Sequence, residues 1–65
     1  MSSVRSVATF VHDMSNVIGV MRGRAELTAM QSGDDGVRRS MIEIQKAADR
    51  AMAMLDDYFP PRGLG

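Results

Sequence analysis

The chemistry open to this chain centres on its single histidine. His12 is followed directly by Asp13 and, one helical turn later, by Asn16. A neutral imidazole can attack a phosphoryl group, and a neighbouring carboxylate can orient the ring or hold its proton. An amide one turn away can position a water molecule for attack on the phosphorus. These three side chains are the candidate catalytic group.

Simpler interpretations of the same residues stay open. His12 could be an ordinary surface histidine without a role, and Asn16 a solvated helical amide. We expect no metal site, because the sequence offers no second imidazole and no thiolate. We also expect no cofactor on this chain, because it contains no glycine-rich phosphate-binding motif.

Two glycines follow the histidine at helical spacing. On a wheel that advances 100° per residue, Gly19 and Gly23 lie on the same side as His12, which falls about 130° from the centre of the apolar positions. A glycine inside a helix costs about 1 kcal/mol relative to alanine. Either close helix packing or clearance for a partner's helix would account for them. With Ser15, these glycines are the expected partner contacts.

The elements that position these residues follow from the apolar spacing. In segment 3–31 the apolar or small residues are Val4, Val7, Val11, Met14, Ile18, Met21, Ala25 and Thr28. In segment 36–59 they are Val37, Met41, Ile44, Ala48, Ala51, Leu55 and Tyr58. Steps that alternate between three and four residues predict two helices packed with a left-handed twist.

The predicted fold is all-α, an antiparallel two-helix hairpin over residues 1–59. It consists of a helix over 3–31, a turn over 32–36 and a helix over 36–59, and residues 60–65 form a Pro/Gly-rich tail or linker. Asp34 or Asp35 is expected to cap the second helix. A lone hairpin buries each apolar stripe on one side only, so we expect a homodimer that forms a four-helix bundle. Met14→Asp or Ile18→Asp is expected to unfold it.

Composition excludes several other classes of protein. The 65 residues contain no cysteine, so a disulfide framework and a cysteine nucleophile are excluded. Eight basic and eight acidic residues cancel, which argues against binding nucleic acid through bulk charge. No apolar run approaches the roughly 20 residues of a membrane span.

The sequence from Phe10 to Leu27 resembles a known motif. It is similar to the histidine-containing H-box of two-component sensor histidine kinases, in the variant H-D-x-x-N followed by aliphatic residues, a glycine and Glu-Leu. Segment 44–59, with Ala47, Arg50, Ala51 and Leu55, resembles the second helix of that family, in which an A-x-x-R-A pattern is followed by a leucine. The resemblance covers roughly residues 4–59.

The resemblance implies a dimerisation and histidine phosphotransfer domain in the bacterial cytoplasm. In that family the histidine matching His12 accepts the γ-phosphoryl group of ATP and passes it to an aspartate of a response-regulator receiver domain. The residue matching Asp13 acts as a base or orienting group. The residue matching Asn16 aligns water for the reverse, phosphatase reaction. The receiver docks beside the histidine, in agreement with clearance at Gly19 and Gly23.

The chain lacks the family's ATP-binding domain, so we expect part of a kinase or phosphotransferase and not a complete kinase. ATP and magnesium would bind only to a separate catalytic domain, supplied in cis or in trans. The expected partners are a second copy, a receiver domain and that kinase domain, without nucleic acid. Two other functions stay open: a non-catalytic dimerisation or adaptor hairpin, and an RNA-binding hairpin dimer. The lack of a basic stripe counts against the latter.

Overall fold

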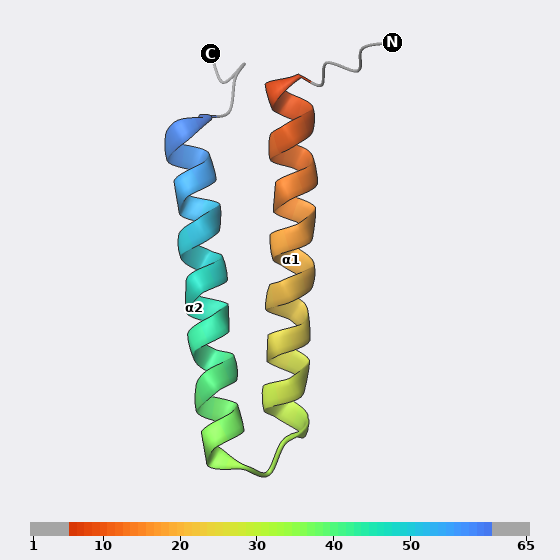
Figure 1. Ribbon diagram of the computed structural model, residues 1–65, viewed down its shortest axis with the longest axis vertical. Helices are drawn as coiled ribbons and strands as arrows, with labels where there is room; N and C mark the ends of the chain where they lie inside the picture. The colour runs from red at the N-terminus through yellow and green to blue at the C-terminus, as the bar shows by residue number, and fades with distance from the viewer. Residues whose placement is uncertain (1–5, 61–65) are drawn as a thin grey trace.

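Two antiparallel helices make up the part of the chain that the computed structural model describes, residues 6–60 (Figure 1). Helix α1 spans Val7–Gln31 and helix α2 spans Asp35–Tyr58. They lie side by side in a single layer, joined by a short connection at one end. No strand occurs within residues 6–60, and neither helix is long and apolar enough to cross a membrane. The predicted all-helical hairpin is confirmed.

Helix α1 begins at a serine cap. Ser6 has extended backbone angles (φ −71°, ψ 161°), and its hydroxyl oxygen accepts a hydrogen bond from the Thr9 N–H at 3.1 Å. A serine hydroxyl can accept a hydrogen bond from one of the unpaired N–H groups in the first turn of a helix, so the helix starts directly after Ser6. The predicted start at residue 3 was therefore too early, and Val4 lies outside the described residues.

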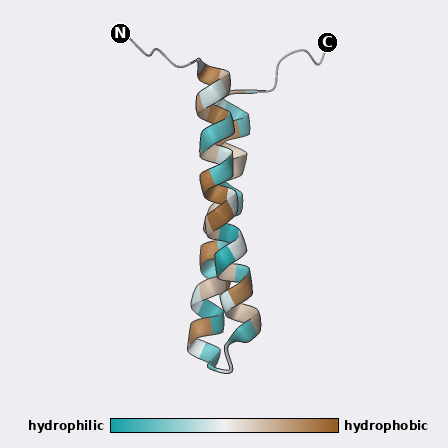
Figure 2. Ribbon diagram, turned by 90° about the vertical axis from the view of Figure 1, so that its right-hand side faces the viewer, coloured by the Kyte–Doolittle hydropathy of each residue, from teal (hydrophilic) through white to brown (hydrophobic). Residues whose placement is uncertain are grey.

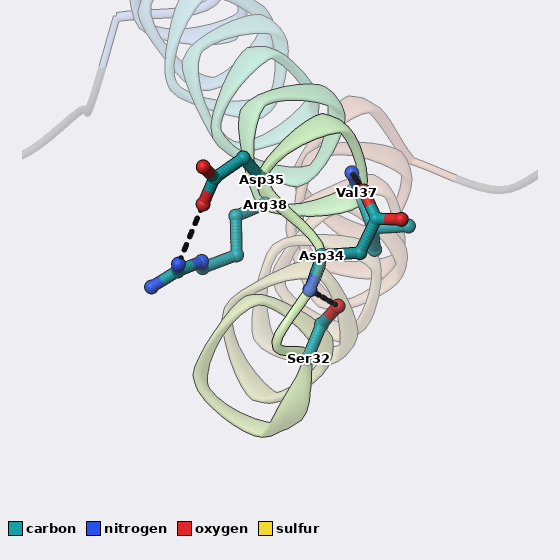
Figure 3. Close-up of polar contacts among 5 residues, drawn as sticks. All are labelled: Ser32, Asp34, Asp35, Val37 and Arg38. Carbon is teal, nitrogen blue, oxygen red and sulfur yellow. Dashed lines mark hydrogen bonds and ion pairs between the residues drawn. The ribbon is translucent and has the colours of Figure 1, made fainter.

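The turn between the helices is fixed by aspartate and serine side chains (Figure 3). Ser32 Oγ accepts a hydrogen bond from the Asp34 N–H at 3.0 Å, and Asp34 Oδ1 accepts one from the Val37 N–H at 3.1 Å. Asp34 is thus the N-cap of α2, which starts one residue before the predicted position. Asp35, in the first turn, pairs with Arg38 at 2.7 Å and suits the positive end of the helix dipole.

The interior of the hairpin is narrow. Three side chains are buried within residues 6–60: Ile18, Ala25 and Ala48. Half-buried residues extend this line at intervals of seven, namely Val11 on α1 with Met41 and Leu55 on α2. Because two of the three buried residues are alanines, the contact area between the helices is small. Most of the packing between α1 and α2 comes from these residues and from those spaced seven apart from them.

The second set of heptad positions is covered only in part by the neighbouring helix, since Met14 and Ala51 are half-buried. Met21 is 49% exposed and Ile44 is 42% exposed, although the apolar spacing placed both in the packed stripe. The half-buried positions next to them are Arg22 and Gln45. The packed strip thus runs along Ile18, Ala25 and Ala48 and their half-buried neighbours Arg22 and Gln45, and Met21 and Ile44 lie beyond its edge.

Exposed and half-buried apolar side chains on one side of the hairpin form a surface that we call the apolar face. It consists of Phe10, Met14, Val17 and Met21 on α1 with Ile44, Ala51 and Met54 on α2. A shallow groove between the helices is lined by four of these residues, Phe10, Met14, Ala51 and Met54. The others follow at helical spacing on the same side. Figure 2, which views the pair from the α1 side, shows hydrophobic segments recurring along that helix.

Candidate functional site

His12 lies in the second turn of α1, with its side chain directed to solvent. The side chain is 75% exposed. Its Nδ1 atom lies 3.7 Å from Asp13 Oδ1, which is beyond a hydrogen bond but close enough for electrostatic attraction to a protonated ring. The carboxylate stands near Nδ1, so Nε2 is the nitrogen available to an incoming electrophile.

The other candidate residues divide between the exposed surface and the helix contact. Asp13 and Asn16 are exposed, and Asn16 follows His12 by one turn, about 6 Å along the helix axis. Ser15 is half-buried, because it lies on the side of α1 that turns toward α2. An incoming partner would therefore reach His12, Asp13 and Asn16 more readily than Ser15.

The space beside both helix glycines is open. A Cβ atom added at Gly19 or Gly23 would meet no other atom within 4 Å, apart from the local backbone. Close packing between α1 and α2 therefore does not require glycine at either position. The open space is compatible with the other interpretation, clearance for a partner outside the hairpin.

An ion pair between the helices lies on the same side of the hairpin as His12. Arg22 Nε donates a hydrogen bond to Asp49 Oδ1 at 2.8 Å, and Arg22 Nη1 lies 3.7 Å from Glu26 Oε1. The hydrogen bond to Asp49 and the charge of its carboxylate raise the pKa of the Arg22 guanidinium, with a smaller contribution from Glu26. The spacing of residues along the chain does not identify Asp49 as the partner of Arg22, because this pairing depends on the register between the helices.

A largely apolar groove of about 890 Å³ opens beside the imidazole at the ends of the helices. His12 forms its edge, Val7 and Val11 of α1 form one wall, and Tyr58 and Phe59 form the other. Phe10 and Phe59 meet edge to face nearby, with their ring centres 5.9 Å apart. Sequence reasoning did not predict this groove, because it arises only where the two helix ends come together.

Within residues 6–60, no group of three His, Asp or Glu side chains is placed to hold a metal ion. Comparison with protein-family models, curated proteins and solved structures finds no match for the chain. The chemically most capable feature of residues 6–60 is the exposed imidazole of His12 beside a carboxylate, an amide and an open helix surface.

Proposed function

We propose that this chain is a dimerisation and histidine phosphotransfer domain of a two-component signalling system in the bacterial cytoplasm. In this proposal His12 accepts a phosphoryl group and passes it to an aspartate of a receiver domain. The observation that carries it is the exposure of the His12 side chain, 75%, beside Asp13. A protein-bound phosphoryl group can reach a ring nitrogen only where no neighbouring side chain blocks the approach. The resemblance of residues 10–27 to the H-box supports the same function.

The transfer is a displacement at phosphorus. Nε2 of His12 attacks the phosphorus of the receiver's aspartyl phosphate, an N–P bond forms, and the P–O bond to the receiver's carboxylate breaks. The carboxylate leaves with the bonding electron pair, and Nδ1 keeps its proton. Asp13, 3.7 Å from Nδ1, stabilises the positive charge on the imidazole ring. The reverse displacement phosphorylates the receiver.

Asn16 has a separate role in this proposal. Its amide, one turn beyond His12 on the exposed side of α1, aligns a water molecule for attack on the receiver's phosphoryl group. The open surface at Gly19 and Gly23 gives the receiver room to approach, and the groove beside His12 offers it apolar contacts. Phosphotransfer and dephosphorylation therefore depend on different side chains.

Transfer of labelled phosphate from a receiver domain tests the catalytic proposal. We expect the wild-type chain to acquire phosphate that is labile in acid and stable in base, as expected for a phosphoramidate. His12 is the only histidine, so His12→Gln should acquire none. The matched control, Asn16→Ala, should still acquire phosphate at His12 but should slow dephosphorylation of the receiver. Equal labelling of wild type and His12→Gln, or no labelling of wild type by any receiver tested, would refute phosphotransfer.

The proposed homodimer rests on the apolar face. No residue of this face carries a charge, whereas Arg22, Glu26 and Asp49 lie on the opposite side of the hairpin. A second copy presents the same uncharged surface, and two copies related by a twofold axis would bury both faces in a four-helix bundle. The zero net charge of the chain means that two copies do not repel each other through bulk charge.

A non-catalytic dimerisation or adaptor hairpin is the second candidate, because the apolar face alone would suffice for it. In that case His12→Gln and Asn16→Ala would leave every partner interaction and every signalling output unchanged. Loss of receiver phosphorylation in His12→Gln, with dimerisation retained, would decide for the phosphotransfer function.

A further inference from the structure

We infer that Met21 and Met54 are oxidation sites whose conversion to methionine sulfoxide prevents two copies of this chain from associating. The inference rests on the proposed dimer and adds a chemical control to it. The oxidant is a hydroperoxide, and the partner excluded by oxidation is the second copy.

The two methionines combine exposure in the single hairpin with a place on the apolar face. Met21 is 49% exposed and Met54 is 59% exposed. Met54 lines the shallow groove of that face, and Met21 follows Met14, another residue of the groove, by one heptad. Both thioethers are therefore open to solvent when the hairpin is alone and covered when a second copy packs on this face.

Met30 provides an internal comparison. It is 75% exposed, and it lies nine residues after Met21, which places it half a turn around α1 on the opposite side. Met30 should therefore react with peroxide at the same rate whether one or two copies are present. Helix α1 thus carries one methionine, Met21, whose oxidation rate should depend on dimerisation and one, Met30, whose rate should not.

Oxidation changes the face from apolar to polar. The thioether sulfur attacks one oxygen of the peroxide, an S–O bond forms, the O–O bond breaks, and water leaves when the peroxide is hydrogen peroxide. Sulfur loses two electrons and the peroxide gains them. The sulfoxide is a polar hydrogen-bond acceptor, so covering it with an apolar surface is unfavourable. A methionine sulfoxide reductase with a dithiol reductant reverses the change.

The first test measures oxidation rates at each methionine by peptide fragmentation and mass spectrometry after brief exposure to hydrogen peroxide. At a chain concentration about 100 times the dimer dissociation constant, we expect Met21 and Met54 to react about 15-fold more slowly than in dilute solution, because only the free hairpin is open to attack. The rate at Met30 should not change. Concentration-independent rates at Met21 and Met54 in a chain that sedimentation shows to be dimeric would overturn the inference while the dimer stands.

The second test uses variants. Peroxide should convert the wild-type dimer to monomers, and Met30→Leu should respond in the same way. The double variant Met21→Leu/Met54→Leu should remain dimeric after the same treatment. Dissociation of this double variant, or a wild-type dimer that persists with both sites oxidised, would overturn the inference. If the untreated chain is monomeric at every concentration, the dimer proposal fails with it.

Discussion

At the scale of single residues, the side of α1 that carries His12 is distinguished by two glycines without side chains. Gly19 and Gly23 sit in the middle of a 25-residue helix, where alanine would be the more stable choice. The structure offers no steric reason for either, since both positions open onto free space. In the proposed function, this cost is explained by the receiver domain, which needs open space beside His12.

Alanine at these positions separates stability from function. We expect Gly19→Ala and Gly23→Ala each to raise the free energy of unfolding by about 1 kcal/mol, and the midpoint temperature by about 4–8 °C for a chain of this size. The same variants should slow phosphotransfer from a receiver, because each added methyl group narrows the approach to His12. Thermal unfolding by circular dichroism and the transfer assay measure the two effects.

Gly33→Ala is the control, because Gly33 lies in the connection between the helices and also opens onto free space. It should leave the transfer rate unchanged. Normal transfer rates in Gly19→Ala and Gly23→Ala would show that these glycines are not needed for the partner's approach.

At the scale of the helices, local signals in the sequence determine where each element starts. Asp34 follows the prediction for a cap, and its carboxylate accepts the Val37 N–H at 3.1 Å. Gly36 stands directly behind it, where a Cβ atom would come within 3.1 Å of Asp34 Oδ1. A larger residue at position 36 would therefore crowd the Asp34 carboxylate, and glycine avoids this contact.

Removing the cap should weaken α2 measurably. We expect Asp34→Ala to lower the free energy of unfolding by about 1 kcal/mol, because the N–H of Val37 loses its acceptor. Asp34→Asn should lose far less, since the amide oxygen can also accept this hydrogen bond. Chemical denaturation monitored by circular dichroism measures the difference.

The matched control is Asp35→Ala, which removes an exposed ion pair with Arg38 and leaves the cap in place. Surface pairs of this kind contribute little, so its effect should be well below that of Asp34→Ala. Equal losses in the two variants would contradict the capping role.

Contacts between the helices were harder to predict than the helices. The heptad spacing correctly placed Ile18, Ala25 and Ala48 in the interior. It also placed Met21 there, because spacing alone does not say whether one neighbour or several surround a helix. With a single neighbour in the described structure, Met21 turns outward. The candidate site was likewise predictable only in part. The helical-wheel position of His12 predicted its exposure, whereas the groove beside it depends on residues of both helices.

The ion pair between the helices was also not predictable from the sequence alone. Arg22 and Asp49 are 27 positions apart, and only the register of the folded hairpin makes them neighbours. The raised pKa of Arg22 leaves the guanidinium charged in the folded and unfolded chain at every pH below its ordinary value. As long as Asp49 keeps its negative charge, the stabilisation from Arg22 is therefore constant up to that pH and is lost only at more alkaline pH. Added salt is the practical way to weaken this pair, because both side chains are partly exposed.

At the scale of the whole molecule, a single layer of two helices has two broad sides, neither covered by another part of the described chain, and the apolar face occupies one of them. The proposed bundle makes a directional prediction about that side. We expect Val17→Asp to convert the dimer to monomers, because the charge would be trapped between two apolar faces. Light scattering after size-exclusion chromatography measures the molecular mass.

Val20→Asp is the matched control, since Val20 is an exposed valine of the same helix that lies outside the apolar face. It should remain dimeric with unchanged helix content. Dissociation in both variants, or in neither, would argue against a dimer through this face.

The hairpin topology also determines how the molecule responds to mechanical tension. Both ends of the described chain lie at one end of the pair, and the connection lies at the other (Figure 1). Force applied between residues 6 and 60 would therefore peel the helices apart sequentially and would not shear them along their length. The Phe10–Phe59 ring contact would open first, and the Arg22–Asp49 pair only afterwards. The Phe10–Phe59 contact lies at the same end of the hairpin as His12. Tension would therefore separate His12 from α2 before it separates the rest of the two helices.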